Sequence, residues 1–325
     1  MHAIVGQTFS EVLLGIESRM VHAPVVRTER WQGVDVRENP AAATRELMNV
    51  EIEVPMRGIV DPSYWAGDIR PNLPWADDHF LERTGGEPLN PGVQWSNWPW
   101  GRSAGRFRDG ANLPRFNHTY AERLWPKYAR YTTDGRLPFG TDGSRPRRSI
   151  CPRAGETPGG HRGIAWEYGD LQDVAEMLVR EPHTRQAWIP LFFPEDTGTA
   201  DGGRKPCTLG YHFIVRDDRL SLYYPLRSCD LIRHFRDDCY LAVRLLLWMI
   251  DLCRSIDESG LWVRVLPGTY SMHCTSLHVF TQDEEELWKK MPPGQPSRKS
   301  ERSTISSASA GTDQEISDRI MAALG

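Results

Sequence analysis

The segment Asp237–Ile256 constrains the fold of this chain more than any other. Apolar side chains cover nearly every face of a helix here, at Leu241, Val243, Leu245, Leu246, Leu247 and Trp248. A helix that is apolar all round is buried rather than placed on a surface. The rest of the chain is therefore expected to fold around this helix.

The spacing of apolar residues predicts both helices and strands around it. We expect amphipathic helices at Phe9–Met20, Trp75–Arg83, Tyr120–Tyr131 and Asp170–Arg180. Strands are expected at Leu47–Val54, Gln186–Phe193, Leu261–Leu266 and Thr269–Phe280. Leu209–Val215 and Arg219–Tyr224 flank Asp217-Asp218, which predicts a hairpin. The chain is thus predicted to belong to the α/β (α+β) class.

The 325 residues are enough for one large domain. Neither internal repeats nor a domain-splitting linker interrupt the sequence before its last part, so residues 1–290 are expected to form a single domain. Residues 291–325 are polar and rich in Ser, Pro and Lys, and we expect a disordered tail with a short helix at Ile316–Leu324.

Composition argues against several classes of protein. A net charge of −4 is unusual for a general nucleic-acid binder. No apolar run approaches the roughly 18–20 residues of a membrane span, and Met1–Gly15 lacks the pattern of a secretory signal. Six cysteines in a chain of this length do not make a disulfide scaffold, and Cys229, Cys239 and Cys253 lie in apolar stretches typical of core residues. These features predict a cytoplasmic protein with no membrane or nucleic-acid partner.

Two short segments carry side chains suited to chemistry. In Pro206-Cys207-Thr208, the cysteine follows Arg204 and Lys205, and positive neighbours favour the reactive thiolate. Arg227-Ser228 offers a guanidinium fork and a hydroxyl, donors that suit a phosphate. By itself, Cys207 is equally compatible with a buried cysteine of a strand.

Other single residues have equally ordinary alternatives. Asp230 and Asp238 could cap a helix, and His278, on an apolar strand, could be a hydrogen-bonded core histidine. Neither a phosphate-binding glycine loop nor a zinc-spaced Cys/His cluster is present in the sequence, so no metal is expected.

Four segments together resemble the thymidylate synthase family of enzymes that modify C5 of pyrimidine nucleotides. They are Thr184-Arg185, Pro206-Cys207-Thr208, Arg227-Ser228-Cys229-Asp230 and Ser276-Leu277-His278-Val279-Phe280. Their order and spacing fit the family from Arg185 to Phe280, and the match is weaker from Leu47 to Arg180. The resemblance implies a thymidylate synthase-like fold, with a large mixed or antiparallel sheet packed against the long helix and a homodimer formed through the sheet.

The resemblance also implies roles for the residues that carry it. Cys207 would be the nucleophile that adds to C6 of the base. Arg227 and Ser228 match the family's phosphate-binding pair, and Arg185 matches an arginine that reaches the partner subunit's phosphate. The family often has a second arginine beside the latter, where this chain has Gln186.

Sugar recognition would depend on His278, which matches a histidine that contacts the sugar hydroxyl. Its usual tyrosine partner is replaced by Phe280, which removes one hydroxyl and leaves the choice between deoxyribose and ribose open. A phosphate-loop arginine near the N-terminus has two candidates, Arg37 and Arg45.

The folate side of the site would involve Asp230, which matches an acid that binds the pterin ring of 5,10-methylenetetrahydrofolate. Glu82 is our candidate for the glutamate that organises water and proton transfer, within a register of one or two residues. Tyr120–Trp125 resembles a Tyr-Gly-x-x-Trp segment that borders the folate and the base; its tryptophan comes one residue later, as in the hydroxymethylase branch.

Asp238 lies eleven residues after Arg227, where uracil-using members carry an asparagine. A carboxyl group can accept from cytosine N4–H₂ and, when protonated, donate to N3. Phe235-Arg236-Asp237-Asp238 also resembles the Phe-Arg-Asn-Asp of phage dCMP hydroxymethylases.

The expected function is hydroxymethylation of dCMP in the cytoplasm, or in the host cytoplasm if the chain is phage-encoded, to make precursors of modified DNA. Three alternatives remain open: a dCMP methyltransferase, a hydroxymethylase of dUMP or CMP, and a catalytically silent nucleotide-binding homologue.

Overall fold

A computed structural model of the chain describes residues 2–26, 29–31, 34–90, 92–95, 97–99, 116, 118–126, 169–193, 196–197 and 205–289. The chain divides into two units, Met1–Asp283 and Glu284–Gly325. The described part of the second unit contains the helix α8 (Glu284–Trp288). The expected tail at 291–325, including the helix at Ile316–Leu324, lies outside the described residues.

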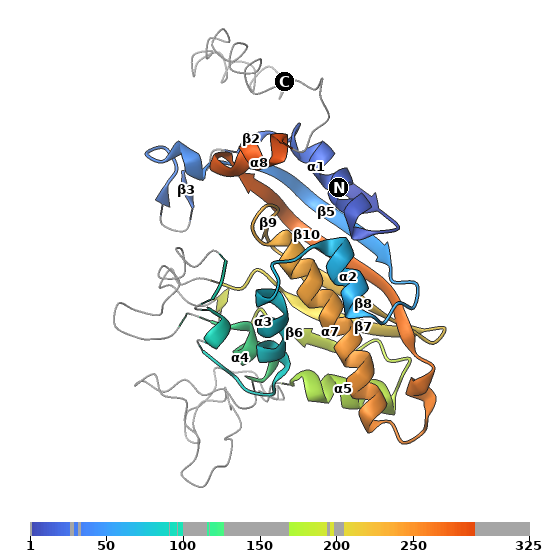
Figure 1. The fold of residues 1–325 in the computed structure, drawn as a ribbon. Helices are drawn as coiled ribbons and strands as arrows, with labels where there is room; N and C mark the ends of the chain where they lie inside the picture. The colour runs from blue at the N-terminus through green and yellow to red at the C-terminus, as the bar shows by residue number, and fades with distance from the viewer. Residues whose placement is uncertain are drawn as a thin grey trace, which may run out of the picture. The chain divides into compact units, whose positions relative to one another are not determined.

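A mixed sheet forms the centre of the first unit (Figure 1). Its strands run in the order β1 (His2–Val5), β5 (Thr44–Pro55), β10 (Leu266–Phe280), β8 (Arg219–Leu226), β7 (Gly210–Arg216) and β6 (Trp188–Pro190). Two short strands join it at the side, β2 (Val25–Val26) on β5 and β9 (Cys229–Asp230) on β10. β10 is antiparallel to β5 but parallel to β8 and β9, so the expectation of a large mixed sheet is confirmed.

The predicted hairpin is confirmed as β7 and β8. Asp217 and Asp218 occupy the turn with φ of 51° and 54°. Two successive positive φ values match the twist of paired strands, and aspartate tolerates this region better than most residues.

The long apolar helix is α7 (Phe235–Ile256), which packs on β8 and β10 as expected from its sequence. Three further helices contact it: α2 (Pro62–Ile69), α3 (Trp75–Thr84) and α5 (Leu171–Arg180). Figure 1 shows these four helices on one face of the sheet. The first turn of α7 therefore lies where strand ends and neighbouring helices meet.

The remaining helices of the first unit begin at side-chain caps. α1 (Phe9–Met20) has the bounds predicted from its apolar spacing, and Thr8 Oγ1 accepts from the N–H of Glu11. α4 (Tyr120–Leu124) begins with a capping box of Thr119 and Glu122. The short elements are β3 (Arg30–Trp31), β4 (Val34–Asp35), η1 (Pro40–Ala42), η2 (Val93–Trp95), η5 (Leu261–Val263) and η6 (Thr281–Asp283).

Three predictions of elements need correction. Leu261–Leu266 is not a strand: Gly260, at φ 77°, leads into the 3-10 turn η5, and β10 begins only at Leu266. Within Gln186–Phe193, only Trp188–Pro190 pairs as β6. The helix expected at Tyr120–Tyr131 ends at Leu124, and residues 127–131 lie outside the described part.

The two faces of the sheet differ in exposure. One row of aligned residues is buried beneath the helices and consists of Ile4, Ile52, Met272, Tyr224, Tyr211 and Ile189. The adjacent row points to the other face and consists of Val5, Glu53, Ser271, Tyr223, His212 and Trp188. In this second row Tyr223 and Trp188 remain 37% and 38% exposed. The unit thus presents a sheet face with exposed aromatic side chains.

Within the described ranges, no helix has both the length and the apolar character needed to cross a membrane.

Candidate functional site

Cys207 lies in the segment that leads into β7 and is half-buried. Its carbonyl accepts from the N–H of Arg227 at 2.9 Å, and Thr208 bridges to Leu226. The backbone around the cysteine is therefore held against the end of β8, the strand that precedes the Arg-Ser pair.

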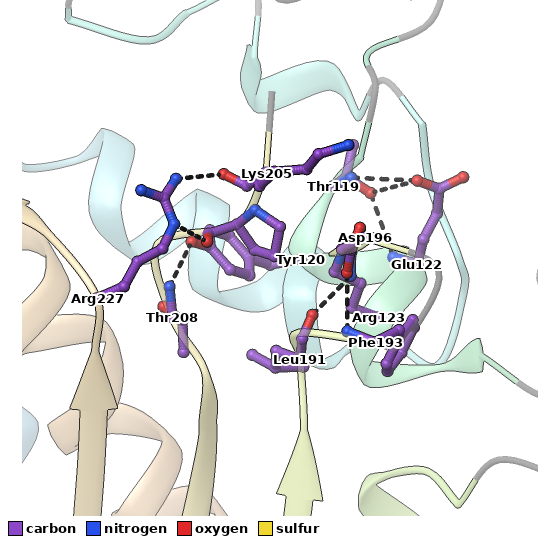
Figure 2. A network of polar contacts seen from close by, with 11 residues as sticks. Thr119, Tyr120, Glu122, Arg123, Leu191, Phe193, Asp196, Lys205, Thr208 and Arg227 are labelled. Carbon is purple, nitrogen blue, oxygen red and sulfur yellow. Dashed lines mark hydrogen bonds and ion pairs between the residues drawn. The ribbon is translucent and has the colours of Figure 1, made fainter. Parts of the chain in front are cut away.

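The Arg227 side chain curls around this same segment (Figure 2). Its Nε donates to the Pro206 carbonyl at 2.8 Å and its Nη2 to the Lys205 carbonyl at 2.9 Å. A guanidinium has five N–H donors, so others remain for a ligand. Arg227 thus supports the backbone before Cys207, a role that the sequence did not indicate.

Tyr120 approaches the cysteine from α4. Its hydroxyl oxygen accepts from the N–H of Thr208 at 3.4 Å, and Thr208 Oγ1 lies 3.0 Å from the hydroxyl of Tyr224. Burial raises the pKa of Tyr120, and the nearby Cys207 and Asp238 raise it further. The phenol therefore keeps its proton at neutral pH and can donate it to a ligand or a neighbour.

Asp238 lies in the first turn of α7 and is half-buried. It does not cap the helix, because the capping position is His234, whose side chain makes no cap hydrogen bond. The carboxylate accepts from Cys229 Sγ at 3.5 Å. Its charge also contributes to the raised pKa values of Tyr120 and Tyr224, which places it among groups from α4 and β8.

His278 and Ser228 are brought together by the pairing of β9 with β10. Ser228 Oγ lies 3.4 Å from His278 Nδ1, and Phe280 packs edge-on against the ring at 5.3 Å. Burial lowers the pKa of His278, although Asp230 opposes the change. The imidazole is therefore neutral at neutral pH, with one N–H to donate.

Asp230 is buried in a local turn. Its Oδ1 accepts from the N–H groups of Ile232 and Arg233, each at 3.0 Å. Its Oδ2 is buried without a hydrogen-bond partner in the described part of the chain, and Arg233 Nε lies 3.7 Å away. Burial raises the pKa of this carboxyl. Asp230 therefore does not cap α7, which begins after His234; one of its oxygens holds the turn before the helix, while the other is a buried acceptor without a hydrogen bond in the described residues.

Glu82 lies near the end of α3, with its carboxylate against η2. Its Oε2 accepts from the N–H of Gln94 at 3.0 Å, and a side chain at Gly92 would collide with the carboxylate. Burial raises the pKa of Glu82, and the Gln94 N–H and Arg83 oppose the change. A raised pKa makes a carboxyl a better proton carrier than an ordinary surface glutamate.

Arg83 is a residue of the site that the sequence reasoning missed. It is only 9% exposed, and its guanidinium lies over the ring of Tyr120 at 4.4 Å. Its Nε donates to His79 Nε2 at 2.9 Å. The sequence could have indicated this residue by its spacing, because Arg83 lies four residues after His79 on the helix face that also buries Ala76 and Phe80.

The other predicted residues lie farther from Cys207 or are already engaged. Trp125 is 6% exposed and donates its indole N–H to the Arg83 carbonyl at 2.8 Å, so any cofactor contact is confined to its accessible edge. Arg185 is exposed, and its carbonyl lies 3.0 Å from His212 Nε2, beside the exposed row of the sheet. Arg37 pairs with Asp35, and Arg45 is buried with Nη1 donating to the Ala23 carbonyl.

A buried ion pair anchors α4, the helix that carries Tyr120. Arg123 binds Asp196 through Nη1 and Nη2, at 2.6 and 2.7 Å, and its Nη1 also donates to the Leu191 carbonyl (Figure 2). This ion pair fixes α4, and with it Tyr120, against the segment that follows β6.

A scan of the chain against protein-family models finds no match. A search of curated proteins likewise finds no match. In the described residues, no three His, Cys, Asp or Glu side chains gather closely enough to hold a metal ion.

Proposed function

We propose that the chain transfers a one-carbon unit to C5 of dCMP and releases 5-hydroxymethyl-dCMP. The observation that carries the proposal is the convergence of Cys207, Tyr120 and Asp238 from three separate segments of the chain. A half-buried thiol, a protonated phenol and a carboxylate are the groups that addition to a cytosine ring requires.

Cys207 would act as the nucleophile. Its sulfur adds to C6 of the base, the C5–C6 double bond opens, and C5 becomes a carbon nucleophile. When the product forms, the C6–S bond breaks and the thiol is restored. Net, the hydrogen on C5 is exchanged for CH₂OH, whose carbon comes from the folate and whose oxygen comes from water.

Asp238 would select cytosine. Its carboxylate can accept from N4–H₂, whereas uracil offers a carbonyl oxygen at the same position, which has no hydrogen to donate to the carboxylate. The phosphate would contact the free donors of Arg227 together with Ser228, whose hydroxyl lies beside His278.

5,10-Methylenetetrahydrofolate would supply the one-carbon unit at the oxidation level of formaldehyde. Asp230 fits such a ligand, because its Oδ2 is a buried acceptor without a hydrogen bond in the described residues. Glu82 would hold the water that enters the product and move its proton, consistent with its burial and raised pKa.

A homodimer through the exposed face of the sheet is part of the proposal. Trp188 and Tyr223 lie in the exposed row, and such aromatic side chains are enriched where subunits meet. Arg185 lies at one end of this face, where its side chain would be able to reach the phosphate of the partner subunit.

CMP is the second candidate substrate. Phe280 is 4% exposed and packs against His278, so it provides no hydroxyl at the sugar site. A site without that group has less reason to distinguish deoxyribose from ribose.

The test compares dCMP, CMP and dUMP with 5,10-methylenetetrahydrofolate, following the mass of the nucleotide and the absorbance of dihydrofolate. We expect dCMP to gain CH₂O without dihydrofolate. Dihydrofolate formation would indicate methylation, and a preference for dUMP would contradict the role of Asp238. Cys207→Ser should abolish turnover while nucleotide binding survives; binding without turnover in the unmodified chain would favour a silent homologue.

A further inference from the structure

Three polar residues on α3 form a buried chain that ends at Glu82. His79, Glu82 and Arg83 lie three and four residues apart, so they share one side of the helix. We propose that Arg83 fixes the tautomer of His79, and that the resulting N–H of His79 positions the Glu82 carboxylate. The inference rests on the proposed function only in giving Glu82 a part in proton transfer.

The tautomer of His79 follows from its contact with Arg83. Arg83 Nε donates to His79 Nε2 at 2.9 Å. A guanidinium can only donate, so Nε2 must carry the lone pair. Burial and the charge of Arg83 hold the pKa of His79 well below its usual value, which keeps the ring neutral. The single ring proton is therefore on Nδ1.

The nitrogen that carries this proton lies near Glu82. It is buried without a hydrogen-bond partner in the described part of the chain and lies 3.9 Å from Glu82 Oε1. An unpaired buried donor costs about 1–3 kcal/mol. Approach of the two atoms by about 1 Å would make a hydrogen bond of ordinary length. Glu82 Oε2 is already held by the Gln94 N–H, so a small rotation about that oxygen is sufficient.

The His79 ring is locked in place by aromatic neighbours. It stacks on Trp75 at 4.9 Å, with 19° between the planes, and meets Trp95 edge-on at 5.9 Å. Only 3% of the residue is exposed. The movement that completes the hydrogen bond must therefore come from Glu82.

Other charged and titratable groups lie on the elements that neighbour His79, Glu82 and Arg83. α4 contributes Tyr120 under Arg83, while η2 consists of Val93, Gln94 and Trp95 and contributes no titratable group. From α7, Asp237 accepts from Asn72, and Tyr240 and Arg244 bind Asp77 of α3. Arg83 is thus the charge that opposes the effect of burial on the pKa of Glu82.

The first experiment reads the tautomer directly and requires no substrate. The full chain, with ¹⁵N-labelled histidine, is studied by long-range ¹H–¹⁵N NMR, and His79 is assigned with a His79→Gln variant. We expect a neutral ring at pH 7 with the proton on Nδ1, and loss of this preference in Arg83→Met. A proton on Nε2, or an imidazolium at pH 7, would overturn the inference.

The second experiment uses two variants that separate the contact of His79 with Arg83 from its contact with Glu82. The amide of His79→Asn places an N–H near the former Nδ1, whereas the amide of His79→Gln places an acceptor near the former Nε2 and gives Glu82 no donor. In His79→Gln, the pKa of Glu82, measured by ¹³C NMR, should rise because the charged carboxylate loses a donor. In His79→Asn it should stay close to that of the unmodified chain.

Turnover of dCMP then links the chain of residues to catalysis. We expect kcat to fall about ten- to a hundredfold in His79→Gln with little change in KM, and to be largely rescued in His79→Asn. Equal pKa values of Glu82 in the two variants would show that His79 does not position the carboxylate. This outcome would refute the inference even if dCMP is the substrate. If the tautomer and the pKa values are as predicted but dCMP is not turned over, the inference about His79 is supported and the proposed function is refuted.

Discussion

Asp238 lies in the first turn of α7, where its carboxylate accepts from Cys229 and faces buried groups of α4 and β8. Its neighbour Asp237 has a different part, since both of its oxygens accept from Asn72, at 2.8 Å each. Two adjacent acids therefore have separable roles, one toward the site and one toward the loop before α3.

If the proposed function holds, Asp238→Asn should shift substrate preference from dCMP toward dUMP. An amide can pair with N3–H and O4 of uracil, and it leaves a polar group of cytosine poorly matched. We expect the ratio of kcat/KM for dCMP over dUMP to fall roughly ten- to a hundredfold. Asp237→Asn is the matched control and should lower stability without changing this ratio. An unchanged ratio in Asp238→Asn would count against base selection by this residue.

His79 should make folding stability depend on pH. Its pKa is lowered in the folded state, so the unfolded chain binds the proton more readily and stability falls as pH drops below about 6.5. His79→Gln should reduce this fall by up to about 1.4 kcal/mol per pH unit. Urea unfolding at pH 7.5, 6.5 and 5.5 measures the difference; the same dependence of stability on pH in the two proteins would show that the pKa of His79 is not lowered in the folded state.

At the scale of elements, α3 and η2 hold Glu82 through a close backbone approach. Gly92 lies directly against the carboxylate, and Gln94 donates to it from the same turn. Gly67, in the interior of α2, has open space around the position of a side chain. The two glycines therefore predict opposite effects of the same substitution.

Gly92→Ala should displace the Glu82 carboxylate and lower kcat at least tenfold, a change equivalent to about 1.4 kcal/mol. Gly67→Ala is the control: it should raise the free energy of unfolding by roughly 0.4–1 kcal/mol, because alanine reduces the entropy of the unfolded chain. Steady-state kinetics and urea unfolding on both variants test this. Full activity in Gly92→Ala would mean that Glu82 is not needed in its present position.

At the scale of the whole molecule, the helices bury one face of the sheet and leave the other exposed in the single chain. The exposed row crosses all the strands from β1 to β6 and includes Tyr223 at its middle and Trp188 at one end. Exposed aromatic side chains on a regular sheet favour association of subunits.

Tyr223→Glu should convert the expected dimer into a monomer, since it places a charge in the middle of the contact. Sedimentation velocity measures the change. Leu14→Glu is the control, because Leu14 is 64% exposed on α1 and should tolerate a charge without dissociation. A monomer in the unmodified chain would refute the dimer.

Complementation tests whether subunits share sites. Arg185→Ala and Cys207→Ser should each be inactive, but a mixed dimer has one site with an intact Cys207 and an Arg185 from the partner subunit. Activity should return on mixing. No recovery, despite exchange of subunits, would mean that Arg185 does not reach the neighbouring site.

The predictions that succeeded from sequence rest on local physics. The bounds of α1, the burial of α7 and the turn at Asp217-Asp218 follow from apolar spacing and turn chemistry within a few residues. The error at Leu261–Leu266 has the same basis, because an apolar stretch does not reveal whether a partner strand is present. The choice of Cys207 and Asp238 as candidates rested on the resemblance to a family, and their roles stay predictions.

Only the tertiary structure decided how these candidates meet. Tyr120 reaches Thr208 across 88 positions of sequence, and His278 meets Ser228 across 50, through contacts that no local pattern encodes. The burial of Arg83, and the burial of a His79 N–H that has no partner among the described residues, depend on α3 packing against α4 and α7. Side-chain type and spacing are properties of the sequence, whereas desolvation and distance arise only when remote segments pack together.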